Sequence, residues 1–169
     1  MANHNPFFVG FYHEYDENGC FSNWYPAEFD LDGIHFSNTE QYMMYQKARL
    51  FGAEELANRI LEAKTPAECK TLGKEYIAGF DGKAWDEKSI ELVKPGIKEK
   101  FRQNPDLLKE LLSTGNALLA ECAPYDKKWG IGIAVDDPRR FDISKWSGKN
   151  YLGFILMQVR EELRRENKT

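Results

Sequence analysis

One stretch of the chain, SNTEQYMMYQKA at residues 37–48, combines an acid and an amine with apolar neighbours. If the stretch is helical, each residue turns by roughly 100°, so Glu40 and Lys47 lie about 20° apart around the axis. Met43 and Met44 fall beside them on the same face. A buried carboxylate or ammonium group is costly unless it pairs or meets a ligand. This face is therefore the first candidate for chemistry.

The residues of this helix leave two interpretations open. In the first, Glu40 completes a capping box that begins at Ser37, and Lys47 lays its aliphatic stem over the methionines. In the second, both side chains face a ligand as reacting groups. The helix alone does not decide between them.

A second candidate is the segment AECAPYDKKWGIG at residues 120–132. Glu121 lies on an expected strand, and Asp126 and Trp129 follow in a glycine-rich loop. An indole can stack on a base while carboxylates bind ribose hydroxyls or carry protons. The alternative is a turn stabilised by Asp126, with Trp129 closing the edge of the core. The stretch WGIGIAV lacks the third glycine and the following helix of a dinucleotide fingerprint.

Further candidates carry weaker signals. In FSNWYP, residues 21–26, Ser22 and Asn23 stand among rings, which suits a base-stacking loop and equally a plug of the core. Trp85 opens an expected helix, a place where tryptophan is more often part of the core. The three dispersed histidines assemble no Ser-His-Asp or Cys-His arrangement and no zinc spacing. Acyl transfer and metal chemistry are therefore disfavoured.

The composition is that of an ordinary globular protein. A chain of 169 residues with 42% hydrophobic and 30% charged residues predicts one domain over residues 1–169. A net charge of −4 argues against a sequence-independent grip on a nucleic-acid backbone. The three cysteines form no C-x-x-C pair, which favours the reducing cytoplasm over a disulfide framework. No apolar run approaches the roughly 18 residues of a membrane span, so we expect a cytoplasmic protein. We expect no cofactor, no metal and no obligate protein partner.

The elements that must position these residues are short strands first and helices later. Residues 7–13 predict a strand, and residues 27–37 a hairpin turning at Asp32-Gly33. A helix is expected from Ser37 to Phe51 with Gly52 as its stop, then another over Ala53–Ala63. Thr65, Pro66 and Glu68 predict a capping box for a third helix.

The rest of the chain completes an α+β pattern. Asp86 is expected to cap a helix through Val93 that Pro95-Gly96 interrupts, and Asn104 and Pro105 open another. A strand at residues 117–123 precedes a loop over 124–150 without periodicity, a length that is often functional. Asn150 is expected to cap a last helix through Glu166. The predicted fold is mostly helical with a small antiparallel sheet.

Read together, these segments resemble the NADAR family, also called YbiA-like. The resemblance extends from about Phe21 to Leu163, and its pieces occur in the family's order. They are FSNWYPAEF, DGIHFSNTEQYMMYQKA, the Trp85 helix, KFRQNPDLLKELLSTGNALLAEC, DKKWGIG and GKNYLGFILMQVREEL. Met43, Met44 and Val93 depart from the residues frequent in the family, without removing a polar group. Such departures bear on substrate choice rather than on activity.

The resemblance implies an α+β N-glycosidase that breaks the bond between ribose and a base nitrogen. Its expected substrate is ADP-ribosylated guanine in nucleic acid, from which ADP-ribose is removed. The alternatives are hydrolysis of phosphorylated riboflavin-pathway intermediates, and an ADP-ribose or NAD-binding module without catalysis. The expected partner is thus an ADP-ribose-containing or phosphoribosyl substrate, either a small molecule or a nucleic acid.

The same resemblance places functional roles on particular residues. The predicted catalytic residues are Glu40, Lys47 and Asp126. Lys47 is expected either to steady a phosphate or leaving group, or to attack the sugar and form a Schiff base. The predicted substrate-binding residues are Ser22, Asn23, Trp85, Glu121, Trp129, Gly130 and Asn150.

Overall fold

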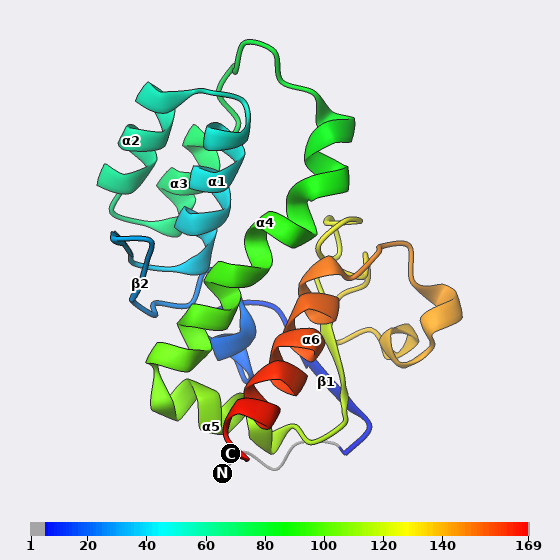
Figure 1. Ribbon diagram of the computed structural model, residues 1–169. Coiled ribbons are helices and arrows are strands. Elements are labelled where there is room, and N and C mark those ends of the chain that lie inside the picture. Colours follow the sequence, from blue (N-terminus) through cyan, green and yellow to red (C-terminus); the bar gives the residue numbers. More distant parts are fainter. Residues whose placement is uncertain (1–5, 169) are drawn as a thin grey trace. The chain divides into compact units, whose positions relative to one another are not determined.

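The structure is a computed structural model that describes residues 6–168 (Figure 1). The chain divides into two compact units. One comprises the residues up to Tyr25 together with those from Pro105 onward, and the other comprises Pro26–Asn104. The single domain expected over residues 1–169 stays a prediction.

The unit Pro26–Asn104 opens with the predicted hairpin. Strands β2 (Phe29–Leu31) and β3 (Ile34–Phe36) pair antiparallel, with Phe29 opposite Phe36. Asp32 and Gly33 between them have φ values of 53° and 76°. Positive φ at both central residues is what a two-residue hairpin turn of the I′ type requires. The Asp-Gly signal in the sequence therefore identified the turn correctly.

Helix α1 (Thr39–Leu50) follows directly, but its N-cap differs from the prediction. The cap is Asn38, whose Oδ1 accepts a hydrogen bond from the Gln41 backbone N–H at 2.9 Å. The Gln41 side chain reaches back and accepts a hydrogen bond from the Ser37 N–H at 2.8 Å. The predicted capping box of Ser37 with Glu40 is therefore wrong by one residue. An amide pair, Asn38 and Gln41, serves this helix start instead.

Helices α2 (Glu54–Glu62) and α3 (Pro66–Leu72) complete a layer with α1 (Figure 1). The capping box predicted for α3 is confirmed, because the Thr65 hydroxyl accepts from the Glu68 N–H and the Glu68 carboxylate accepts from the Thr65 N–H. Gly52 has φ +71° beyond the end of α1, as its predicted role as a stop requires.

Helix α4 (Gly82–Gln103) is continuous, which the sequence did not predict. It is capped by Asp81 rather than Asp86, and Pro95 lies inside it. The side chain of Tyr42 contacts the helix backbone beside Pro95, where its hydroxyl donates to the Leu92 carbonyl at 3.0 Å. In a regular helix that carbonyl would accept from the amide of Gly96. The Tyr42 ring packs on Gly96, so the Pro-Gly pair forms a contact site for α1 instead of a break.

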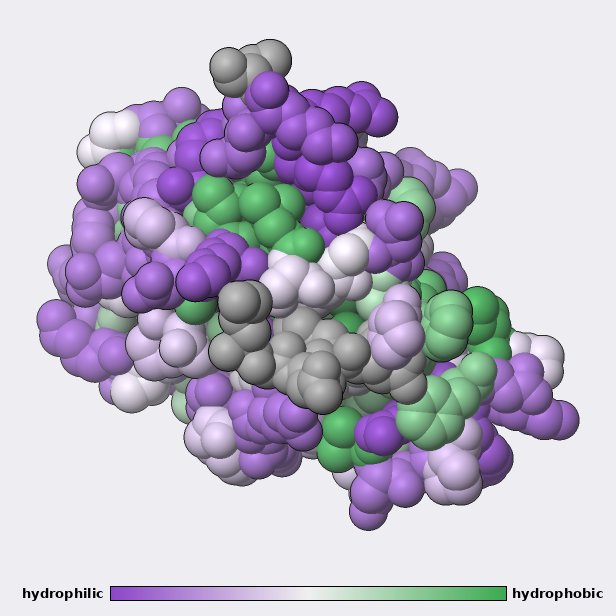
Figure 2. Space-filling model, turned by 90° about the horizontal axis from the view of Figure 1, so that it is seen from below, coloured by the Kyte–Doolittle hydropathy of each residue, from purple (hydrophilic) through white to green (hydrophobic). Residues whose placement is uncertain are grey.

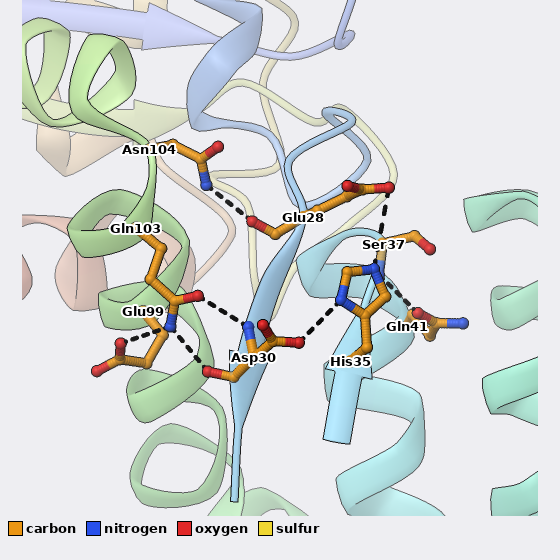
Figure 3. Close-up of polar contacts among 8 residues, drawn as sticks. All are labelled: Glu28, Asp30, His35, Ser37, Gln41, Glu99, Gln103 and Asn104. Atoms are coloured by element: carbon orange, nitrogen blue, oxygen red, sulfur yellow. Dashed lines mark hydrogen bonds and ion pairs between the residues drawn. The ribbon is translucent and has the colours of Figure 1, made fainter. Parts of the chain in front are cut away.

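The end of α4 is tied to the hairpin by side-chain amides (Figure 3). Gln103 makes a two-way contact with the backbone of Asp30, accepting from its N–H at 2.9 Å and donating to its carbonyl at 2.8 Å. Asn104 donates to the Glu28 carbonyl at 2.9 Å. On the other side of the hairpin, the ring of His35 lies 2.9 Å from the Asp30 carboxylate. These contacts fix the strands that lead into α1.

The other unit is built on a parallel strand pair. Strands β1 (Phe8–Phe11) and β4 (Leu118–Glu121) lie side by side, with Phe11 opposite Glu121. Both strands were predicted, but their parallel pairing was not. Helix α6 (Tyr151–Glu166) packs against β4, and α5 (Pro105–Ser113) packs against α6. The fully buried side chains here include Phe11, Phe21, Leu111, Leu119, Ile131 and Leu152.

Short 3₁₀ turns occupy the remaining segments of this unit. They are η1 (Gly19–Phe21), η2 (Pro138–Phe141) and η3 (Ile143–Lys145). The predicted long loop over 124–150 therefore contains two 3₁₀ turns and no α-helix or strand. Within residues 6–168, no helix combines the length and the hydropathy that crossing a bilayer requires.

Hydrophilic residues cover most of the face that Figure 2 shows, and apolar residues reach it in patches. Several large hydrophobic side chains are exposed on the molecule, among them Phe7, Tyr15, Tyr76, Tyr125 and Ile143. Scattered exposed rings are common on soluble proteins. They do not by themselves mark an interface.

Candidate functional site

Glu40 lies in the first turn of α1 and is buried, with 5% of its surface exposed. Because Asn38 is the N-cap and Gln41 accepts from the Ser37 N–H, Glu40 does not form the capping box that was expected with Ser37. Its negative charge acts on the thiol of Cys69. Burial, and then the charge of Glu40, raise the pKa of Cys69 to about 11. A carboxylate in such a setting can serve proton transfer or charge stabilisation.

Lys47 lies two turns further along α1 and is half-buried. Its Nζ donates to the Gly73 carbonyl at 2.6 Å and lies 4.9 Å from the centre of the Phe80 ring. Met44 fills the space beside Gly73, where a Cβ atom would come within 2.0 Å of the methionine sulfur. The amine is thus held by a backbone carbonyl and an aromatic face. The alternative in which the Lys47 stem only lies over the methionines therefore leaves out these two contacts of Nζ.

Trp85, the remaining predicted site residue of this unit, lies in the first turns of α4 and is 7% exposed. The unit Pro26–Asn104 therefore supplies a buried carboxylate, a positioned amine and a buried indole.

Glu121 is the last residue of β4, and both of its backbone polar groups are fixed. Its N–H donates to the side-chain oxygen of Asn150 at 3.1 Å, and its carbonyl accepts from the Ile131 N–H at 2.8 Å. Asn150 also donates through Nδ2 to the Leu119 carbonyl at 2.9 Å. Its amide therefore holds the edge of β4, and its predicted role in substrate binding stays a prediction. Asn150 does precede α6 as expected, with φ 55° and no side-chain hydrogen bond to the helix.

Asp126 organises the loop that carries Trp129. Its Oδ1 accepts from the backbone N–H groups of Lys128 at 2.9 Å and Trp129 at 2.8 Å. The indole of Trp129 is 9% exposed and meets the Tyr151 ring edge to face at 5.8 Å. Gly130 is packed so closely that a Cβ atom there would lie 2.8 Å from Ala123 Cβ. One oxygen of Asp126 thus builds the turn that the alternative interpretation expected.

Tyr12 is a candidate that the sequence analysis missed. Burial raises its pKa, and the charges of Glu121, Tyr125, Tyr15 and Asp126 raise it further, in that order. Its hydroxyl therefore lies in the field of both predicted acids of its unit. No local pattern in the sequence points to Tyr12, because its position depends on the parallel register, in which Phe11 lies opposite Glu121 and Tyr12 follows Phe11.

Ser22 and Asn23 follow the turn η1 and are 4% and 6% exposed. The Ser22 hydroxyl accepts from the Trp24 N–H at 3.1 Å, which stabilises the local turn. The predicted site residues thus fall into two groups. Glu40, Lys47 and Trp85 belong to Pro26–Asn104, and Ser22, Asn23, Glu121, Asp126, Trp129, Gly130 and Asn150 belong to the other unit.

No group of three His, Cys, Asp or Glu side chains in the described part of the chain could hold a metal ion. The chemistry available to the predicted residues is that of carboxylates, an amine and indoles, and Tyr12 adds a phenol. These groups suit proton transfer, nucleophilic attack and binding of a sugar and a base.

The chain is similar to known proteins over most of its length. The NADAR domain model matches residues 10–164. An N-glycosidase of Acanthamoeba polyphaga mimivirus is 40% identical over 161 residues, covering 90% of this chain and 94% of that protein. A riboflavin biosynthesis protein of Vibrio vulnificus is 33% identical over 154 residues, covering 90% of this chain and 38% of that protein. The NMR structure of the Escherichia coli protein YbiA matches with a TM-score of 0.79 and 27% identity, over 97% of this chain and 89% of that one. This structural match confirms the predicted α+β, mostly helical fold.

Proposed function

The chain belongs to the NADAR domain family, and on this basis we propose that it is an N-glycosidase that hydrolyses the bond between ribose and a base nitrogen. The observation that carries the proposal is the extent of the family match. It covers residues 10–164 and so includes every predicted site residue of both units. The mimiviral relative named as an N-glycosidase aligns over nearly its whole length, which supports the same activity here.

We further propose that the substrate is ADP-ribosylated guanine in nucleic acid, from which ADP-ribose is released. The net charge of −4 fits recognition of one modified nucleotide rather than a grip on the phosphate backbone. A second candidate is a phosphorylated riboflavin-pathway intermediate. It is favoured by the similarity to the riboflavin biosynthesis protein of Vibrio vulnificus.

The proposed mechanism follows from the charge that builds up when the bond breaks. The anomeric carbon gains oxocarbenium character, and the departing base gains electron density. A carboxylate stabilises the positive charge at the anomeric carbon, and an acid protonates the departing base. We assign these two roles to Glu40 and Asp126. Asp126 holds its turn with Oδ1, so Oδ2 is the oxygen assigned to the substrate.

Lys47 is proposed as the nucleophile. Its neutral amine attacks the anomeric carbon, and the base leaves with the bonding electrons and a proton. The ring oxygen then takes a proton as the sugar opens to a Schiff base, which water hydrolyses to free the amine and the sugar. The contacts of Nζ with the Gly73 carbonyl and the Phe80 ring hold the amine in one place. Because both contacts favour the charged ammonium, the proposed mechanism requires Lys47 to lose a proton before it attacks.

The experiment that tests this function combines turnover with trapping. The chain is incubated with ADP-ribosylated DNA, free ADP-ribose is measured by chromatography, and borohydride is added in a parallel sample to reduce a covalent adduct for mass spectrometry. We expect release of ADP-ribose and an adduct on Lys47. Lys47→Arg serves as the matched control, since it keeps the positive charge but cannot form the same imine.

Three outcomes would contradict parts of the proposal. An adduct that persists in Lys47→Ala excludes Lys47 as the nucleophile. Turnover of a riboflavin-pathway intermediate without turnover of the ADP-ribosylated DNA moves the assignment to the second candidate. If the parent chain releases nothing, and binds ADP-ribose as tightly as Glu40→Gln does, the chain is a binding module.

A further inference from the structure

The side chain of Asn150 joins the start of helix α6 to the edge of β4 that faces away from β1. The N–H groups of Leu118 and Cys122 donate on the β1 side, so the backbone groups of the alternate residues face the opposite edge. There the Oδ1 of Asn150 accepts from the Glu121 N–H at 3.1 Å, and its Nδ2 donates to the Leu119 carbonyl at 2.9 Å. One side-chain amide thus takes the place of a neighbouring strand.

The backbone around Asn150 holds the loop that carries Trp129. The N–H groups of residues 150–152 donate to the carbonyls of residues 128–130 at 3.0–3.2 Å. The first N–H groups of a helix have no acceptor within the helix, and here the loop carbonyls satisfy them. The turn that fixes the backbone of Glu121 therefore also fixes the Trp129 loop.

Gly153 makes room for this contact in the first turn of α6. A Cβ atom there would lie 2.1 Å from the Leu119 carbonyl oxygen, 2.4 Å from Asn150 Nδ2 and 2.5 Å from Asn150 Oδ1. All three distances are far shorter than van der Waals contact, so a side chain at Gly153 would push the amide away from β4. The backbone of Asn150 is left-handed, with φ 55°, a conformation that asparagine adopts more readily than most residues.

The groups held in this way belong to the predicted site. Glu121 and Trp129 are predicted to bind the substrate, and Asp126 stabilises the turn that precedes the indole. Asn150 itself is 4% exposed, and its Oδ1 and Nδ2 atoms both bind the backbone of β4. Its amide is therefore placed to orient the residues that would contact the substrate.

We propose that Asn150 is a positioning residue of the glycosidase reaction and that Gly153 permits its position. This inference rests on the proposed function and deepens it. Asn150 acts on the substrate only through Glu121 and Trp129, by setting the direction of the Glu121 side chain and the place of the indole. A displacement of about 1 Å can cost two orders of magnitude in rate, so a contact away from the substrate can control turnover.

The test compares Asn150→Gly, Gly153→Ala and the double variant in the release of ADP-ribose from ADP-ribosylated DNA. Asn150→Gly keeps the left-handed backbone and removes both side-chain hydrogen bonds. We expect each single variant to lower kcat/KM roughly 10- to 100-fold. The double variant should be no slower than the slower single variant, because both changes disrupt the same contact.

Asn18→Gly is the matched control and should keep the parent rate. Asn18 is also left-handed, with φ 62°, and its Nδ2 donates to the Gly10 carbonyl at 3.2 Å. The control therefore repeats the loss of an amide from a left-handed position in the same unit, without touching the contacts of Glu121 and Trp129.

Two further readouts separate positioning from a structural role. In a Glu121→Gln background, Asn150→Gly should reduce kcat/KM much less than in the parent, whereas a loss of folded protein would reduce it equally in both. In the ¹H–¹⁵N spectrum of the chain without substrate, Asn150→Gly and Gly153→Ala should shift the Glu121 amide and the Trp129 indole resonances. Asn18→Gly should leave both resonances unchanged.

The proposal is overturned if folded Asn150→Gly keeps the kcat/KM of the parent. It is also overturned if Gly153→Ala turns over at the parent rate while Asn150→Gly does not, because Asn150 would then contact the substrate itself. The spectra do not depend on turnover. Shifted resonances in variants of an inactive parent would leave the positioning of Glu121 and Trp129 by Asn150 standing while the proposed function fails. Unshifted resonances in an active chain would overturn the positioning and leave the function standing.

Discussion

At the scale of single residues, Asp126 illustrates how one carboxylate can be both structural and chemical. Its Oδ1 accepts two backbone N–H groups and so forms the turn that precedes Trp129. A side-chain amide can make the same two contacts, because its oxygen is also an acceptor. The structural and the proposed catalytic parts of this residue are therefore separable by substitution.

Asp126→Asn is expected to keep the fold and lose activity. The amide oxygen preserves the turn, so the free energy of unfolding should stay close to that of the parent. Without an ionised carboxylate, the glycosidase rate should fall by about 10²–10⁴. Asp126→Ala is the companion variant, which should also lose about 1–3 kcal/mol of stability from the two hydrogen bonds. A parent-like rate in Asp126→Asn would remove this residue from the mechanism.

Tyr12 gives a second prediction at this scale. Its pKa is raised by burial and by the nearby charges of Glu121 and Asp126, among others. Glu121→Gln should therefore lower the pKa of Tyr12 toward its ordinary value, with burial maintaining part of the shift. The measurement is a ¹³C-tyrosine NMR titration, with Glu17→Gln as the control. An unchanged Tyr12 titration in Glu121→Gln would show that the two side chains do not interact.

At the scale of elements, the helix starts show what local sequence can predict. The Thr65–Glu68 box was predicted correctly, because Thr, Pro and Glu at these positions form a self-contained set of local hydrogen bonds. For α1 the pattern that began at Ser37 was misleading. Gln41 accepts from the Ser37 N–H that Glu40 was expected to bind, and Asn38 caps the helix one residue later by accepting from the Gln41 N–H. Gln41 is further fixed by donating to the Ile60 carbonyl at 3.0 Å, a contact remote in sequence.

The continuity of α4 depends on a contact that the local sequence does not contain. Pro95-Gly96 indicates a break, but the ring of Tyr42 covers Gly96 and its hydroxyl donates to the Leu92 carbonyl. A proline inside a helix is tolerated when neighbouring groups satisfy the altered backbone. The Pro-Gly pair is thus a packing site for α1.

Gly96→Ala should be destabilising although alanine normally favours a helix. A Cβ atom at Gly96 would lie 2.2 Å from Tyr42 Cδ1, so the ring must move, at a cost of about 1–3 kcal/mol. Gly82→Ala is the matched control in the same helix, since its Cβ would meet only Phe80 at 3.8 Å. Urea unfolding of both variants is the measurement. Equal stability of the two variants would contradict the packing role.

At the scale of the whole molecule, two thiols link folding to pH. Cys69 and Cys122 are fully buried, and burial is the main cause that raises the pKa of each to about 11. An unfolded thiol ionises near its ordinary value of 9.0, so the folded chain retains these protons more strongly above that pH. The stability from the neutral thiols is complete below about pH 9 and is lost as the pH rises toward 11.

The free energy of unfolding should therefore fall by a few kcal/mol between about pH 9 and 11, because each unit of pKa difference corresponds to about 1.4 kcal/mol. The measurement is urea unfolding under reducing conditions across this range. The Cys69→Ala, Cys122→Ala double variant should show a shallower fall, and Cys20→Ala, at a half-buried position, is the control. A slope unchanged in the double variant would show that the thiols do not cause it.

The sequence by itself determined most elements of this protein, because their signals are local. The Asp32-Gly33 turn, the Thr65 box, the strands at 7–13 and 117–123 and the helix after Asn150 each depend on backbone preferences within a few residues. The ordered motifs also carried the family assignment, which the match over residues 10–164 confirms.

Tertiary structure decided the features that depend on residues far apart in the chain. The parallel register of β1 and β4 brings Tyr12 into the field of Glu121, and Asn150 holds the edge of β4 at Glu121, 29 positions earlier in the sequence. A hollow lined by Tyr12, Asn18, Arg140 and Phe141 likewise joins segments that are more than 100 residues apart in the sequence. Such contacts arise from packing and the burial of polar groups, and no local pattern of residues encodes them.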